Sequence, residues 1–186
     1  MLIASILLAA AGGWTGCSAS LPEAPEVVGE DYPDGGIPVG VAWPSDWLEG
    51  FVGESEAVGG TIVGLRLEYV DDQWVWRVRS VDPGRDFLDD GITEPDRGRE
   101  ALIDASTLRL VQDQHVTLTD AELGQIGVSN YDAAQLSGEV YPSPRLVALE
   151  RGMEDCDVVW RITTYDTETG TQSVTTVDAL ESSSDD

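Results

Sequence analysis

Between residues 61 and 79, apolar and polar side chains alternate in two runs separated by the acidic pair Asp71-Asp72. A period of two over this length predicts two antiparallel β-strands joined by a tight turn. One face of this hairpin is predicted to join the core, and the other is predicted to meet solvent. The solvent face carries Arg66, Arg77 and Arg79, which are expected to pair with Glu68 across the strands. The positions expected on the core face are Val63, Leu65, Leu67, Tyr69, Trp74, Trp76 and Val78.

The centre of this pattern occurs twice. Val75-Trp-Arg-Val78 returns as Val159-Trp-Arg-Ile162, and each copy follows a Leu-Glu pair and precedes a hydrophobic-Asp-Ala triplet. An internal repeat of this kind predicts two copies of one small unit. Trp76 and Trp160 are therefore expected in the core, and the second copy is expected to close with a strand over 172–179.

Helical signals stand before the strands of each copy. Apolar spacing predicts a helix over 46–57, capped by Ser45 or Asp46. Thr119 and Glu122 have the spacing of a capping box, and the continuation of that helix to Leu136 is left open. Each unit thus consists of a helix and about three antiparallel strands, which indicates an α+β fold. The predicted units are 44–112, with an inserted loop at 82–99, and 113–180.

These elements resemble the PepSY family. The residues that carry the resemblance are Val159 to Ile162, the turn 166–170 and Val177-Asp-Ala179 in the second copy, with residues 59–110 fitting as the first. The resemblance implies two tandem helix-plus-antiparallel-sheet units and a protein-binding or protease-restraining role outside the cell. The family has no catalytic residues to transfer.

The N-terminus carries a targeting signal. The apolar run Leu2 to Ala11 is too short to span a bilayer, which takes about 20 residues, and fits the core of a signal peptide. Trp14-Thr-Gly-Cys17 resembles a bacterial lipobox. This similarity predicts a leader at 1–16, lipid on Cys17 and anchoring at the outer face of the cytoplasmic membrane. Residues 17–43, rich in acids, Pro and Gly, are predicted to be a tether, and 181–186 a disordered tail.

A second interpretation uses Ala9-Ala-Ala11 as an ordinary cleavage site, which predicts a secreted soluble protein. Cys17 would then be able to pair with Cys156 in an oxidising compartment. If Cys17 instead carries lipid, Cys156 is expected to be a buried small hydrophobe or an intermolecular link.

Charge limits the choice of partners. Thirty-five acids against ten bases, with no Lys, give a net charge of −25. Such a chain repels nucleic acid, because binding to phosphate needs a basic surface. The charge is expected to keep an exported protein soluble, and the alternative is binding of a basic partner or of divalent cations.

The loop at 82–99 is the candidate contact surface, because loops on rigid scaffolds often carry function. Leu88 and Arg97 stand where a calcium-binding EF-hand would need oxygen ligands, so that motif is rejected and no metal site is assigned. A looser carboxylate site stays open. The candidate contact residues are Asp86, Asp89, Asp90 and Glu94.

No pattern indicates an enzyme or a cofactor. His115 is the only histidine, and zinc-ligand spacing, a nucleophile elbow and a phosphate loop are all missing from the sequence. The sequence therefore predicts a lipid-anchored, non-catalytic module that binds an envelope protein, with a protease as one candidate. The alternatives are a cation or small-ligand binder and, last, a hydrolase.

Overall fold

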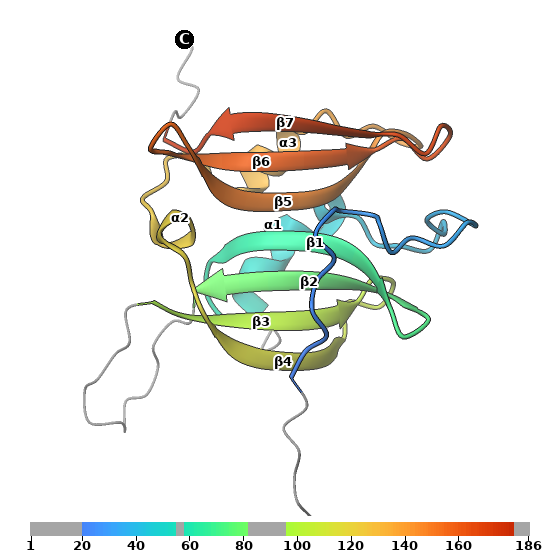
Figure 1. Ribbon diagram of the computed structural model, residues 1–186, viewed down its shortest axis with the longest axis horizontal. Coiled ribbons are helices and arrows are strands. Elements are labelled where there is room, and N and C mark those ends of the chain that lie inside the picture. The colour runs from blue at the N-terminus through green and yellow to red at the C-terminus, as the bar shows by residue number, and fades with distance from the viewer. Residues whose placement is uncertain (1–19, 55–57, 82–95, 181–186) are drawn as a thin grey trace, which may run out of the picture.

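The computed structural model describes residues 20–54, 58–81 and 96–180, without the side chains of 50–54. Its framework is a single antiparallel sheet in the spatial order β4-β3-β2-β1-β5-β6-β7 (Figure 1). The strands are β1 (Ile62–Val70), β2 (Gln73–Val81), β3 (Arg97–Asp104), β4 (Leu110–Thr117), β5 (Arg145–Glu154), β6 (Asp157–Tyr165) and β7 (Gln172–Asp178).

The predicted hairpin is confirmed in β1 and β2. Leu67 lies opposite Trp76, and both side chains are fully buried. Asp71 and Asp72 form the turn with positive φ angles of 48° and 62°, the backbone that suits a two-residue hairpin. A register shift between Ile62 and Gly64 displaces the alternation at the start of β1. As a result Ile62 joins the core, whereas Val63 lines a cavity on the opposite face.

Both motif tryptophans lie in the core, as predicted, and they make corresponding hydrogen bonds. The indole Nε1 of Trp76 donates to the carbonyl of Ala42 at 2.9 Å, and that of Trp160 donates to the carbonyl of Val128 at 2.9 Å. Each acceptor lies two residues before a helix. Burial of an indole is favourable when its N–H finds such a partner.

The described residues form three short helices, which are α1 (Pro44–Glu54), α2 (Asp120–Leu123) and α3 (Asn130–Gln135). Two of them lie on one face of the sheet, and the other, α2, lies at its end between the two halves (Figure 1). The capping box of Thr119 and Glu122 is confirmed, but α2 ends after one turn and a second capping box, Ser129 with Asp132, begins α3. The helix α1 begins at Pro44, so neither Ser45 nor Asp46 is its cap. Within the described residues, no helix is long and apolar enough to cross a bilayer.

The predicted fold class, two tandem helix-plus-sheet units, is wrong. β1 pairs with β5, so the strands of both halves form one sheet, and Trp76 and Trp160 belong to one hydrophobic core. The helices contribute only 11, 4 and 6 residues. The physical reason is that a hairpin with an open edge gains ladder hydrogen bonds by pairing with the other half.

The predicted boundaries also differ from the observed elements. β4 runs through the boundary at 112/113, and β3 begins at Arg97, within the expected loop 82–99. Residues 20–43 belong to the expected tether, yet Leu21, Val28 and Val41 are buried. Apolar residues spaced irregularly in a Pro-rich segment show no period, so sequence patterns give no sign that they pack.

Candidate functional site

The sheet face opposite α1 and α3 carries charged side chains that alternate with the core residues. The sequence predicts this face to be solvated, but Glu68 is 0% and Arg77 is 6% exposed. The N-terminal segment Ser20–Pro25, here called the strap, crosses this face in front of β4, β3, β2 and β1 (Figure 1). The cover provided by the strap is the reason why these charges are buried.

The strap is held by polar and apolar contacts. The Leu21 amide donates to Gln114 Oε1 at 3.1 Å, and the Pro22 and Pro25 carbonyls accept from the guanidinium groups of Arg77 (2.8 Å) and Arg66 (2.6 Å). Leu21 also packs in a small apolar cluster with Val75 and Leu102. The strap is therefore part of the folded domain.

Under and beside the strap, two arginines link three carboxylates into a chain of ion pairs. Arg77 binds Glu68 at 2.8 Å and Glu100 at 2.7 Å, and Arg79 binds Glu100 at 2.6 Å and Glu122 at 2.6 Å. Of the three arginines predicted to pair with Glu68, Arg77 does so, and the pair is buried rather than exposed. Arg66 instead binds Glu150, and Arg79 binds Glu100 and Glu122. Charge-assisted hydrogen bonds of this kind fix geometry, and the chain connects β1, β2, β3 and α2.

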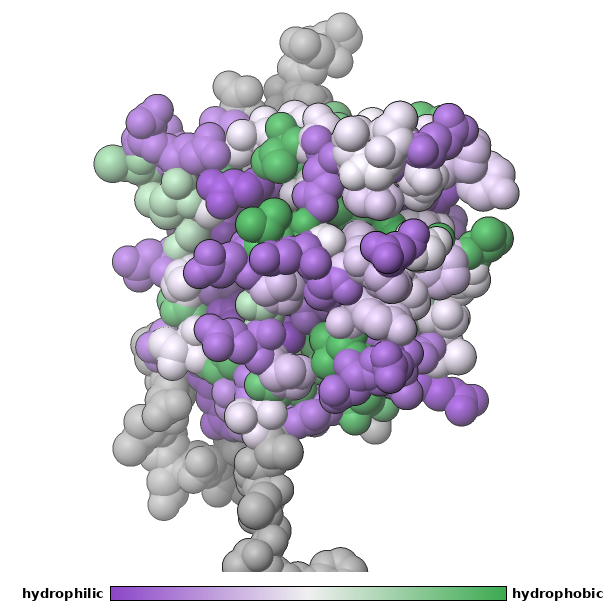
Figure 2. All heavy atoms as spheres, turned by 45° about the vertical axis from the view of Figure 1, so that its right-hand side comes forward, coloured by the Kyte–Doolittle hydropathy of each residue, from purple (hydrophilic) through white to green (hydrophobic). Residues whose placement is uncertain are grey.

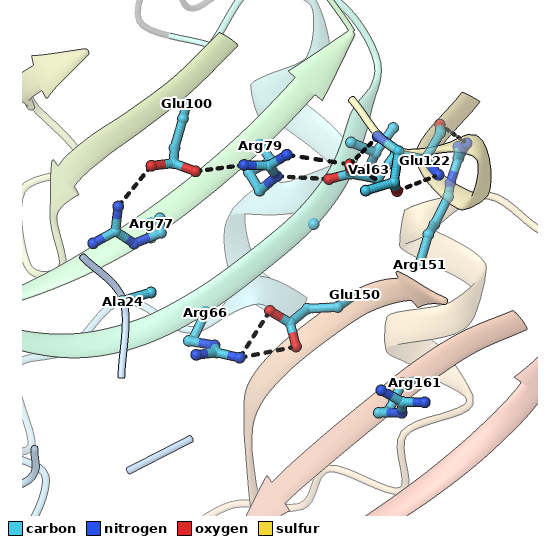
Figure 3. A pocket seen from close by; sticks show the side chains of 12 residues that line it. Ala24, Val63, Arg66, Arg77, Arg79, Glu100, Glu122, Glu150, Arg151 and Arg161 are labelled. Atoms are coloured by element: carbon cyan, nitrogen blue, oxygen red, sulfur yellow. Dashed lines mark hydrogen bonds and ion pairs between the residues drawn. The ribbon is translucent and has the colours of Figure 1, made fainter. Parts of the chain in front are cut away.

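A cavity of about 360 Å³ opens at the end of this ion-pair chain, between the two halves of the sheet. Five of the ten basic residues of the chain line it, although the net charge is −25. The charged side chains that line it are Arg66, Arg77, Arg79, Arg151, Arg161, Glu100, Glu122 and Glu150 (Figure 3).

Two of the lining arginines lack a short contact with a carboxylate. Arg151 Nη1 donates to the carbonyls of Glu122 (2.8 Å) and Gly124 (3.3 Å), and its guanidinium lies 5.0 Å from the Trp160 ring centre. Burial lowers the pKa of Arg151 more than nearby Glu122 raises it. Arg161 lies on the β6 side, where it contacts Glu154 only at 3.4 Å, and its side chain is 49% exposed.

Arg66 is a third arginine that lines the cavity. It lies 3.2 Å from Glu150, which is also the cross-strand neighbour of Arg161. The Nε atoms of Arg66 and Arg151 are buried and make no hydrogen bond. Guanidinium groups bind carboxylates and phosphates in a fork geometry, so this cavity is suited to one anionic group placed between β1, α2 and β6.

The structure places none of the site residues that the sequence predicts. Cys17 and the candidate contact residues Asp86, Asp89, Asp90 and Glu94 lie outside the described residues. Cys156 is exposed in the β5–β6 turn and is not the buried hydrophobe expected beside a lipidated Cys17. His115, the only histidine, lies on β4, and its Nε2 is 3.1 Å from Arg97 Nη2. Within the described residues, no group of three or more His, Cys, Asp or Glu side chains is arranged to hold a metal ion.

Sequence reasoning missed the cavity itself. Arg66, Arg77 and Arg79 were visible as the polar positions of two adjacent strands, and this was the available signal. Arg151 and Arg161 come from the other half of the chain, more than 70 residues away. Their approach depends on the pairing of β1 with β5, which no local pattern indicates.

The comparisons with known proteins assign no family. No family model matches the chain, and no curated protein matches it. One solved structure is similar, a "putative lipoprotein" from Clostridium difficile 630, with 14% identity, 68% of this chain covered, 98% of that chain covered and a TM-score of 0.31. A similarity at this level assigns neither fold nor function to the chain, and the PepSY resemblance found in the sequence has no matching family model.

Proposed function

We propose that this chain is an exported, lipid-anchored protein that binds another envelope protein without catalysis. The proposal of an anchor rests on the apolar run Leu2 to Ala11 and the lipobox-like residues that end at Cys17. The proposed location is the outer face of the bacterial cytoplasmic membrane, and a secreted soluble form is the alternative.

The observation that supports a binding role is the arginine-lined cavity. Arg151 and Arg161 hold positive charge without a short carboxylate contact, and both line the same space. We propose that it receives a carboxylate of the partner, either an acidic side chain or a chain terminus. An ion pair formed there is partly shielded from water and therefore stronger than one on the open surface.

Charge further restricts the proposed partner. A protein of net charge −25 attracts basic surfaces and repels acidic ones over about 8 Å at physiological salt. A fitting partner thus carries one carboxylate within an otherwise basic face. Figure 2 shows hydrophilic residues over most of one face, with hydrophobic residues in small separate groups, which favours polar recognition there. The sequence resemblance keeps a protease among the candidates.

Binding of small anions tests whether the cavity is an anion site. Titration with succinate and with inorganic phosphate, at constant ionic strength, is expected to raise the melting temperature by about 3–5 °C at tenfold excess over Kd. Arg161→Gln should abolish the shift, because it removes a guanidinium that lines the cavity. The variant is expected to fold, since the Arg161 side chain is half-exposed and lies outside the core. Arg99→Gln, which removes a β3–β4 ion pair with Asp113 away from the cavity, is the matched control. No shift with either anion, or equal loss in both variants, would contradict the proposed site.

The anchor has a separate test. The mass of the N-terminal peptide from the native membrane fraction should show acylated Cys17, and Cys17→Ser should release the protein from membranes. An unmodified Cys17 in a protein found in the medium would favour the secreted alternative and would leave the cavity proposal standing.

A further inference from the structure

β7 ends the sheet and has one free edge. It pairs with β6 on one side, and no other described strand lies against its outer side. An edge strand presents unpaired N–H and C=O groups, so it is a template for another strand. This observation is independent of the arginine-lined cavity.

The composition of β7 differs from that of the chain. Residues 172–177 carry no charge, although 24% of all residues are charged. Four consecutive residues, Val174, Thr175, Thr176 and Val177, are β-branched, and this type favours strands. Six of the seven residues of β7 are exposed, and Val174 is 60% exposed.

The usual protection of a free edge is missing from β7. Natural edges are commonly blocked by lysines, prolines or bulges. The chain has no lysine anywhere, and β7 has neither arginine nor proline. Its pairing with β6 from Tyr165–Gln172 to Val159–Asp178 proceeds without a register shift. An edge without a bulge, and without charge over six of its seven residues, indicates in so acidic a chain that a strand pairs there.

We propose that the occupant is a second copy of this chain, with β7 pairing antiparallel to β7 around a twofold axis at Thr175. This register places Val174 opposite the partner's Thr176, and it overlaps all seven residues of the strand. Gln172, whose side-chain amide donates to the Val28 carbonyl, then lies opposite the partner's Asp178, so the only acid of β7 faces an uncharged residue. The two seven-stranded sheets become one continuous sheet.

The pairing is self-complementary in side-chain type as well. Val174, Thr175 and Thr176 each face another β-branched residue, whereas Val177 faces Ser173. Such cross-strand pairs are worth about 0.2–1 kcal/mol each. The opposing force is the repulsion between two chains of charge −25, which salt screens within about 8–10 Å. Dimerisation should therefore strengthen as salt rises, whereas an interface built on opposite charges would weaken.

The test is sedimentation equilibrium of the full chain in density-matched non-ionic detergent and reducing buffer. These conditions remove association through lipid, apolar leader or Cys156. The wild-type chain is expected to dimerise with a Kd below about 100 μM in 0.5 M NaCl, and the dimer is expected to dissociate at lower salt. A monomer across that range at both salt concentrations overturns the proposal, even if a different protein binds the edge.

Two double variants test the register. Val174→Glu with Thr176→Glu places acids opposite each other at two symmetric positions and should weaken the dimer about tenfold or more. Val174→Lys with Thr176→Glu changes the same exposed sites but places lysine opposite glutamate, so it should retain the dimer. Melting temperatures near the wild-type value show that both variants fold. Equal weakening by both variants, or none in either, contradicts this pairing.

Discussion

At the residue scale, Glu122 shows how one side chain serves two structures. Its carboxylate accepts the Thr119 amide at 2.8 Å, which completes the capping box of α2, and binds Arg79 Nε at 2.6 Å. Burial raises the pKa of Glu122, but the hydrogen bonds from Arg79 and Thr119 lower it by more. The pKa of Glu122 therefore lies below the ordinary 4.5. Folding therefore favours the charged form.

This pKa predicts a pH-dependent cost for Glu122→Gln. An acid with a lowered pKa stabilises the fold above its unfolded value, and the stabilisation is lost as pH falls through the folded pKa. Because glutamine retains the capping spacing, the cost at pH 7 should be about 1–2 kcal/mol and should shrink below pH 4.5. Urea unfolding at pH 7 and at about pH 3.5 measures it. Asp120→Asn, in the same turn, is the control; a cost that stays constant with pH would show that charge is not the cause.

Arg77 illustrates what residue patterns predict and what they miss. Alternation placed it opposite the core face and near Glu68, and both expectations are confirmed. Its burial was not expected, because the strap that covers it comes from 55 residues earlier in the chain, through Pro22. Local sequence determines on which face of the sheet a strand residue lies, but distant segments determine whether that face is exposed to solvent.

At the element scale, the hairpins β1–β2 and β5–β6 have matching turns. Asp71 and Asp72 have φ angles of 48° and 62°, and Asp155 and Cys156 have 50° and 75°. Such angles disfavour L-residues, and Asp tolerates them better than most. The second position of both turns is therefore a place where glycine fits the backbone better than the native residue.

Glycine at these positions should stabilise the protein. Asp72→Gly and Cys156→Gly are each expected to raise the free energy of unfolding by about 0.5 kcal/mol, since relief of φ strain exceeds the added entropy of the unfolded chain. Asp72→Asn separates the effect of charge from that of the backbone, and Asp72→Val should destabilise by about 1–2 kcal/mol. Urea midpoints provide the comparison. A loss of stability in both glycine variants would refute the strain argument.

Among the elements, the hairpins and the Thr119 cap could be predicted because period-two alternation and capping spacing are local signals. The split of the second helical segment into α2 and α3 could not. Gly124 and Gly127 interrupt that segment, and the Gly127 and Val128 amides donate to the Ala179 carbonyl. The backbone thus leaves the helix in order to pair with a residue some 50 positions away.

At the scale of the whole molecule, the junction of β1 with β5 determines cooperativity. Leu65 lies opposite Leu149 there, and both are at most 1% exposed. The same core contains Trp76 and Trp160. Two halves that share a sheet and a core are expected to unfold together.

The protein should therefore show one unfolding transition by tryptophan fluorescence and by far-UV circular dichroism. Leu149→Ala should lower stability by about 2–5 kcal/mol and shift the whole curve. The protection of backbone amides from hydrogen exchange should weaken equally in β2 and β6, which belong to different halves of the sequence. Val39→Ala, at a residue 93% exposed, is the control. Two transitions, or weakening confined to β6, would indicate independent halves.

The sequence alone determined the local features of this protein: the strand alternation, the tryptophans of the two motifs as core residues, the capping box and the acidic charge. The net charge is a sum over the composition, and the other features depend on residues within a few positions of one another. The tertiary structure decided that the strands form one sheet, that residues 20–25 cover a charged face and that five arginines line one cavity. Those features arise from contacts between segments far apart in the chain, whose free energy depends on shared burial and pairing and leaves no local pattern.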